Sequence, residues 1–111
     1  MDYKTIANDG IVEEEIKKSR FICHLKRISN EEEGREYIAQ IKKEHHKANH
    51  SCSAMIVGED GQIKRSSDDG EPSGTAGVPM LTVLEKQGLT NVVAVVTRYF
   101  GGIKLGTGGL I

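Results

Sequence analysis

The sequence predicts an α+β domain in which a mixed β-sheet carries its helices on one face. Two patterns predict this class. Apolar and polar residues alternate within residues 10–28, which is the period of a half-buried strand. Apolar residues then recur at helical spacing after residue 30, and the order along the chain becomes strand, helix, hairpin, helix, strand. The 111 residues suffice for one hydrophobic core, and the 37% hydrophobic content is typical of a soluble globular protein.

The first half of the chain is predicted to contain an extended segment, a helix and a hairpin. The extended segment covers residues 10–28. The sequence SNEE at residues 29–32 predicts a capping box, and the helix after it presents a face made of Gly34, Ile38, Ile41 and His45. Residues 51–57 form the next strand, and a turn at residues 58–61 leads into another strand over residues 63–67.

The second half is predicted to contain a short helix and a buried strand. Apolar residues at 80, 81 and 84 mark the helix, which has Pro79 in its first turn and ends at Gly88. Residues 92–100 form the last clear strand, and their apolar run VVAVV predicts burial on both faces. Residues 106–111 resemble the first turn of a further helix, so we expect a chain truncated before its last helix.

Two glycine-rich clusters, at residues 68–77 and 101–109, are the strongest functional signal. Dense glycine predicts tight turns, or a main chain that a ligand approaches closely. The second cluster follows the buried strand, where α/β proteins tend to place ligand sites. Two nucleotide-binding motifs fail there, because Thr107 replaces the P-loop lysine and Ile111 replaces the third glycine of the dinucleotide fingerprint.

The remaining interpretation of the second cluster is a general anion-binding loop. Main-chain N–H groups at the start of a helix would hold a phosphate, and Arg98 and Lys104 would add positive charge. The alternative is that the glycines only let the loop pack tightly beneath a helix.

Other polar clusters have simpler structural interpretations. Asp68, Asp69 and Glu71 offer oxygen ligands for magnesium or calcium, but their spacing matches no EF-hand loop and a solvated turn is the simpler explanation. Ser73 and Thr75 are predicted to cap the following helix. A zinc site could use the histidines at 45, 46 and 50 with the cysteine at 52, yet that cysteine is predicted to point into the core. The sequence therefore predicts no metal, no cofactor and no catalytic residue.

The composition limits which partners and which cellular compartment we expect for this protein. The net charge is −1, which does not favour indiscriminate nucleic-acid binding, but residues 92–111 contain Arg98, Lys104 and no acid. No apolar run approaches the roughly 20 residues of a membrane span, and the N-terminus lacks a secretory pattern. Cys23 and Cys52 are predicted to be reduced and buried, so we expect a cytoplasmic protein without membrane contact.

Three blocks of sequence carry a family resemblance. They are HKANHSCSA at residues 46–54, DDGEPSGTAGVP at 68–79 and VTRYFGGIKLGTGGL at 96–110. In this order they resemble the IMPACT family, and most closely its bacterial YigZ type. The resemblance implies an IMPACT N-terminal-type domain over residues 1–111, without the family's C-terminal helix and ferredoxin-like second domain. It also implies a fold shared with the second domain of small-subunit ribosomal protein five and the fourth domain of elongation factor G.

The resemblance further implies a role in translation, since eukaryotic relatives regulate initiation by competing for the activator of a stress kinase. We therefore expect a non-enzymatic binding module for RNA, the ribosome or a regulatory protein partner. Its predicted surface comprises Asp69, Gly70, Glu71, Ser73, Gly74, Thr75, Arg98, Tyr99, Gly101, Gly102, Lys104, Gly106, Thr107 and Gly108.

Arg98 and Tyr99 alternate along a strand, so only one of them can face a given ligand. The alternative function is an enzyme for a nucleotide or phosphorylated substrate, with Asp69 or Glu71 as metal ligand or base.

Overall fold

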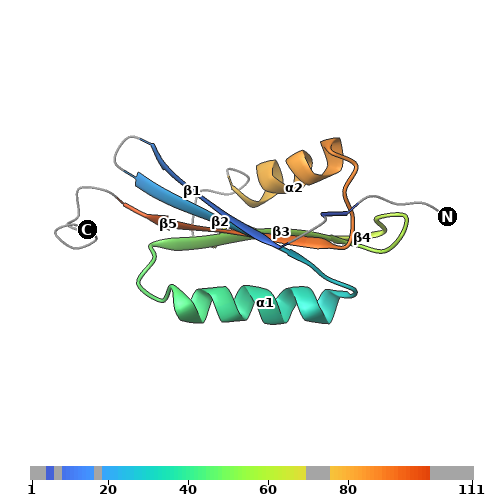
Figure 1. Ribbon diagram of the computed structural model, residues 1–111, viewed down its shortest axis with the longest axis horizontal. Helices are drawn as coiled ribbons and strands as arrows, with labels where there is room; N and C mark the ends of the chain where they lie inside the picture. The colour runs from blue at the N-terminus through green and yellow to red at the C-terminus, as the bar shows by residue number, and fades with distance from the viewer. Residues whose placement is uncertain (1–4, 7–8, 17–18, 70–75, 101–111) are drawn as a thin grey trace.

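One β-sheet of five strands separates two helices in the computed structural model of the chain (Figure 1). The structure describes residues 5–6, 9–16, 19–69 and 76–100. The strands lie side by side in the order β1-β2-β5-β3-β4, so the last of the described strands occupies the centre of the sheet. In chain order the elements are β1 (Gly10–Ile16), β2 (Ser19–Arg27), α1 (Glu31–Glu44), β3 (His50–Val57), β4 (Ile63–Ser67), α2 (Gly77–Lys86) and β5 (Val92–Tyr99).

The α+β class is confirmed, but the predicted mixed sheet is wrong. All four pairs of neighbouring strands are antiparallel. Strands β2 and β3, which α1 connects, do run parallel to each other, but β5 lies between them and is antiparallel to both. Strands β4 and β5 are likewise parallel, with β3 between them. The order of elements along the chain gives no sign of these insertions.

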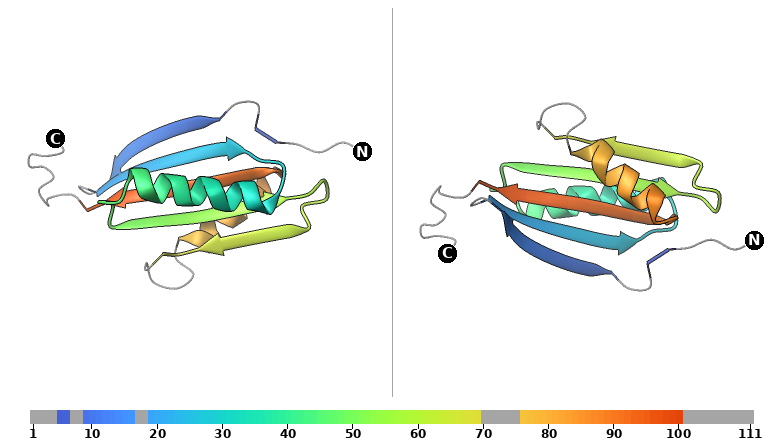
Figure 2. Two further views of the ribbon diagram at one scale, coloured as in Figure 1. Left: turned by 90° about the horizontal axis from the view of Figure 1, so that it is seen from below. Right: turned by 90° about the horizontal axis from the view of Figure 1, so that it is seen from above.

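The predicted placement of both helices on one face is also wrong. Helix α1 covers one face of the sheet and α2 covers the other, as the two views of Figure 2 show. Helix α1 connects β2 to β3, and α2 connects β4 back to β5, so the two connections cross the sheet in opposite directions. Their starting strands, β2 and β4, also point in opposite directions. Two crossovers of the same hand would then place both helices on one face. Since the helices lie on opposite faces, one of the two crossovers is left-handed, whereas crossovers between parallel strands are nearly always right-handed. The prediction of both helices on one face failed for this reason.

Two apolar clusters fill the space between the sheet and the helices. Successive residues of β3 and β5 alternate between them, as the two-residue period of a strand requires. The prediction that β5 is buried on both faces is confirmed. The α1 side holds Ile28, Ile41, Met55, Val57, Val93 and Val95. The α2 side holds Ala54, Ile56, Leu84, Val92 and Ala94.

The N-terminal half differs in detail from the prediction. The extended segment at residues 10–28 is two strands, β1 and β2, paired antiparallel. Helix α1 has Asn30 as its N-cap, whose side chain accepts a hydrogen bond of 2.8 Å from the main-chain N–H of Glu33. Glu33 in turn accepts one of 2.7 Å from the N–H of Ser29. The predicted capping pair is therefore real but lies one residue later.

A carboxylate from outside the helix fixes the start of α2. One oxygen of Asp68 accepts hydrogen bonds from the main-chain N–H groups of Ala76 at 3.1 Å and Gly77 at 2.7 Å. Gly77 also packs directly on the main chain of Ser67, because a Cβ atom at this position would lie 2.7 to 2.8 Å from Ser67 N, C and O. The predicted end of α2 is confirmed, since Gly88 with φ +70° follows the C-cap residue.

We predict that Gly77→Ala destabilises the fold, because neither main chain can move away from the added methyl group. The free energy of unfolding should fall by about 1–3 kcal/mol, measured by urea denaturation. Gly10→Ala is the matched control, because no atom lies within 4 Å of its added Cβ. That control should change stability by about 0.5 kcal/mol or less. Equal effects of the two substitutions would contradict the close approach of Gly77 to Ser67.

Candidate functional site

Three of the predicted site residues lie in the described part of the chain: Asp69, Arg98 and Tyr99. The structure therefore shows the segments that precede the two glycine clusters, at the ends of β4 and β5. Outside the described residues lie Gly70, Glu71, Ser73, Gly74, Thr75, Gly101, Gly102, Lys104, Gly106, Thr107 and Gly108.

The segments that precede the two clusters meet at the start of β3. On one side, Asp69 accepts a hydrogen bond of 2.7 Å from the N–H of Ser51, and His50 Nδ1 donates to the Asp69 carbonyl at 2.9 Å. On the other side, the N–H of Asn49 donates to the Arg98 carbonyl at 2.8 Å. The Asn49 side chain also accepts from the N–H of Phe100 at 2.8 Å. Three consecutive residues, Asn49 just before β3 and the first two residues of β3, thus hold both segments.

Arg98 lies against aromatic rings on the α2 side of the sheet. Its guanidinium carbon is 4.7 Å from the ring centroid of Phe100 and 5.3 Å from that of Phe21. The ring of His50, the cross-strand partner of Arg98, is 5.6 Å from the ring of Phe100. A planar guanidinium stacks well on aromatic faces and keeps its charge at every physiological pH. We refer to Phe21, His50, Arg98 and Phe100 as the Arg98 cluster.

Tyr99 lies on the opposite side of the sheet, in agreement with the predicted alternation. Its hydroxyl is 2.6 Å from Nδ1 of His45, the residue that caps the C-terminus of α1. The guanidinium carbon of Arg20 lies 5.5 Å from the Tyr99 ring centroid. Burial raises the pKa of Tyr99, and the charge of Arg20 opposes this effect. Arg98 and Tyr99 therefore cannot contact one ligand on the same face, and their binding roles stay predictions.

His24 is buried beside the pair formed by His45 and Tyr99. Its side chain is 3% exposed, and neither ring nitrogen has a hydrogen-bond partner within the described residues. Its ring centroid lies 5.0 Å from that of His45. Burial lowers the pKa of His24 below its ordinary value of 6.5, the charge of His45 lowers it further, and Glu44 opposes both. The structure therefore favours a neutral His24.

The described acids of the first cluster are engaged in contacts within the protein. Besides its bond to Ser51, the carboxylate of Asp69 lies 3.2 Å from the ammonium group of Lys42. Asp68 holds the first N–H groups of α2, so these amides are already used. Among the residues that the structure places, no group of three His, Cys, Asp or Glu side chains could hold a metal ion. Cys52 is buried, as predicted, and its thiol donates to the Asp68 carbonyl.

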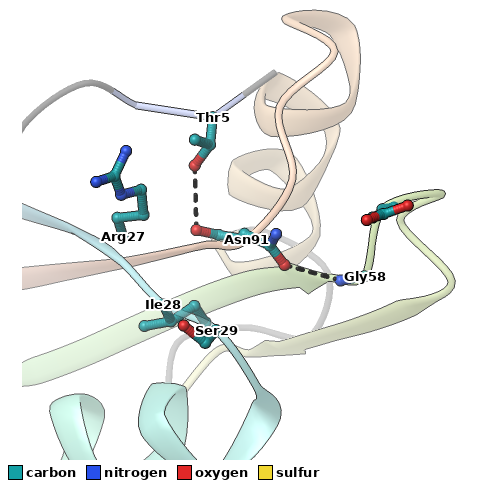
Figure 3. A pocket seen from close by; sticks show the side chains of 7 residues that line it. Thr5, Arg27, Ile28, Ser29, Gly58 and Asn91 are labelled. Carbon is teal, nitrogen blue, oxygen red and sulfur yellow. Dashed lines mark hydrogen bonds between the residues drawn. The ribbon is translucent and has the colours of Figure 1, made fainter. Parts of the chain in front are cut away.

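A separate pocket of about 600 Å³ opens at the other end of the sheet (Figure 3). Asn91 links its walls, because its carbonyl accepts from the Thr5 hydroxyl at 3.2 Å and its side chain accepts from the N–H of Gly58 at 2.9 Å. Arg27 and Glu59 bring charges of both signs to the lining. None of the predicted site residues that the structure describes lines this pocket.

Sequence reasoning missed Phe21 and His24 as neighbours of the predicted site. Both lie on β2, which the alternating pattern identified as a strand. Their position depends on the pairing of β2 with β5, which places Phe21 opposite Arg98 and His24 opposite Val95. No local signal in the sequence indicates a pairing between segments so far apart in the chain.

The fold and the cluster define a class: an α+β domain whose central strand ends in an arginine stacked on aromatic rings. The chain belongs to the family of the Impact N-terminal domain, whose model matches residues 17–111. The predicted family is thereby confirmed. No helix within the described residues is long and apolar enough to cross a membrane.

Bacterial relatives are similar over nearly the whole chain. The IMPACT family member YvyE of Bacillus subtilis is 61% identical over 98% of the chain, and YigZ of Escherichia coli is 49% identical over 90%. The chain spans 50% of the length of each. A crystal structure of a hypothetical protein matches 96% of the chain, and the chain covers 52% of it, with 47% identity and a TM-score of 0.84. The two-domain translational regulator Yih1 also matches 96%, with 43% of its chain covered, 25% identity and a TM-score of 0.65.

We predict that His24 makes stability fall in mild acid. The unfolded chain binds a proton near pH 6.5, whereas burial resists that proton in the folded state. The unfolded state is therefore favoured as pH drops below about 6.5, by up to about 1.4 kcal/mol per pH unit. Urea denaturation between pH 7 and pH 5 measures this slope. His24→Leu should reduce the slope, whereas His46→Leu, at an exposed position, should retain it. An unchanged slope in His24→Leu would show that another group causes the acid sensitivity.

Proposed function

We propose that this domain is a non-enzymatic binding module that acts in translation and recognises RNA or a ribosomal surface. The Arg98 cluster is the contact surface, together with the glycine clusters that follow Asp69 and Phe100. The observation that carries the proposal is the meeting of these two segments at the start of β3, beside a stacked guanidinium. The predicted anion-binding loops would thus begin next to a permanent positive charge.

Arg98 supplies the charge that a phosphate requires. Its guanidinium is held by the rings of Phe21 and Phe100, so less conformational freedom is lost when a ligand binds. Aromatic side chains beside a cation also suit unpaired bases, which stack on them.

The relatives support the translation role. Yih1 is a translational regulator, and it shares the fold of this domain. IMPACT homologues of fungi also match the chain, among them the protein of Schizosaccharomyces pombe at 36% identity. A protein partner, which the family resemblance also implies, is the second candidate ligand. A pull-down whose captured protein survives nuclease treatment would favour that candidate over RNA.

The enzyme alternative has less support from the described residues. A metal ligand or general base needs a carboxylate that can reach the substrate. Asp69 instead uses one oxygen for Ser51 and the other for Lys42. Its φ of +47° further ties this residue to a turn role. A binding function does not require Asp69 to act as a metal ligand or a general base. We therefore propose binding, rather than catalysis, as the function.

We predict that Arg98→Ala weakens the binding of single-stranded RNA and makes it less dependent on salt. Loss of one phosphate contact should reduce the slope of log affinity against log salt by about 0.7. Fluorescence titrations at two or more salt concentrations measure both effects. Arg98→Lys should retain most of the salt slope but lose affinity, because an ammonium group cannot stack on Phe100 as a guanidinium does.

Lys86→Ala is the control for this experiment, because Lys86 is an exposed cation at the end of α2, far from the cluster. It should leave the affinity and the slope unchanged. If Arg98→Ala, with an unaltered melting temperature, binds RNA like the unmodified chain, Arg98 is not the phosphate contact.

A further inference from the structure

A small cationic cavity lies between α1 and the edge strand β4, on the side of the sheet opposite the Arg98 cluster. Its volume is about 210 Å³. In Figure 2, α1 lies over the centre of the sheet and leaves β4 uncovered beside it. The residues that line the cavity come from α1, β3 and β4. Three cations line it: Arg35 and Lys42 from α1, and Arg65 from β4.

The floor of the cavity is built from two cross-strand pairs. Met55 of β3 faces Arg65 of β4, and Ser53 faces Ser67 two residues along. Met55 belongs to the apolar cluster on the α1 side, so the two-residue period places both pairs on that side. Arg35 and Lys42 are seven residues apart, two helical turns, and therefore lie on one face of α1. All three cations therefore line the same cavity as the paired serines.

Ser53 is a buried polar residue that lines this cavity. The residue is 4% exposed, and its cross-strand partner Ser67 lines the cavity with it. A hydroxyl group can donate a hydrogen bond to an anion. The two serines thus add polar groups to a lining that also contains the three cations.

Within the described residues, fewer carboxylates than cations lie at this cavity. One oxygen of Glu31 accepts from both Arg35 at 2.6 Å and Arg65 at 3.0 Å, and Lys42 lies 3.2 Å from Asp69. In the part of the chain that the structure describes, two carboxylates therefore pair with three cations. Arg35 and Arg65 are more than half exposed, and exposed ion pairs contribute little to stability. These pairs can be exchanged for a stronger anion at low cost.

We propose that this cavity binds the terminal phosphate of a small phosphorylated ligand. The guanidinium groups of Arg35 and Arg65 and the ammonium of Lys42 contact the phosphate oxygens, and the hydroxyls of Ser53 and Ser67 donate from the floor. A terminal phosphate carries close to two negative charges, which suits a cavity with excess cations. The cavity is smaller than the roughly 300–1,000 Å³ of pockets that enclose whole ligands. The phosphate enters it, and the rest of the ligand lies outside along β4.

The experiment is an NMR titration of the chain in phosphate-free buffer with inorganic phosphate, adenosine 5′-monophosphate and adenosine. The two phosphates should shift the amide resonances of Ser53 and Ser67, and adenosine should not. Arg65→Gln should weaken phosphate binding about tenfold, as the loss of a charge-assisted hydrogen bond does. Arg27→Gln removes the same charge outside the cavity and should have no effect.

Glu31→Gln gives the more decisive test, because we predict that it increases the affinity for phosphate. Removal of the carboxylate frees both guanidinium groups, so phosphate should bind about two- to fivefold more tightly. A variant that had merely lost its structure would bind more weakly instead. The proposal is overturned if Glu31→Gln does not tighten binding, if Arg27→Gln weakens it as much as Arg65→Gln, or if adenosine produces the same shifts.

Two further results separate this site from the surface proposed for RNA. Arg98→Ala should leave the phosphate titration unchanged, whatever it does to RNA binding. An RNA with internal phosphodiesters and no terminal phosphate should not shift Ser53 and Ser67. Equal shifts with that RNA would overturn the assignment of a terminal phosphate.

Discussion

The burial of β5 between β2 and β3 is the constraint on which the rest of the structure depends. Val92, Val93 and Val95 have no exposed surface, and burial of each side chain contributes about 1.5–3 kcal/mol relative to exposure. The same strand pairs along both of its edges, so its register is fixed twice. A shift by one residue would move every side chain of β5 to the opposite face. Arg98 would then lose its aromatic neighbours, and Tyr99 would lose His45. The position of each polar group at the end of the sheet is therefore a consequence of apolar packing in its middle.

The start of β3 converts this packing into an organised end of the sheet. Asn49 holds the end of β5, and His50 and Ser51 hold the end of β4. These are contacts to the main chain, or from it, and they fix where the chain leaves each strand. The described acids of the first glycine cluster belong to the same framework. Asp68 holds the first turn of α2, and Asp69 joins β3 to α1 through Ser51 and Lys42. Both carboxylates therefore make contacts within the protein, and the binding role of Arg98 stays a proposal.

Local patterns predicted the elements well, and nonlocal pairing explains the failures. Alternation predicted β2, the apolar run predicted the double burial of β5, and glycine with proline predicted the limits of α2. The turn between β1 and β2 was missed, because the sequence there contains no glycine, proline, asparagine or aspartate to mark it. The sheet was predicted as mixed because a strand–helix–strand order normally gives parallel neighbours, and nothing near β2 or β3 reports that β5 separates them. For the site, the sequence predicted Arg98 as a cation beside glycine. It could not predict Phe21, whose contact with Arg98 exists only through strand register.

The central place of β5 has a consequence for the order of assembly during synthesis. The hairpin of β1 with β2 and the hairpin of β3 with β4 are complete before residues 92–99 leave the ribosome. Until that moment each hairpin keeps an open edge and an uncovered apolar face, which are the features that invite wrong partners. The final strand must then enter between two preformed halves, and such long-range pairing is slow. The nascent chain should therefore be unable to complete the sheet until residues 92–99 have been synthesised. Until then, the edges and apolar faces of both hairpins need protection against wrong pairing.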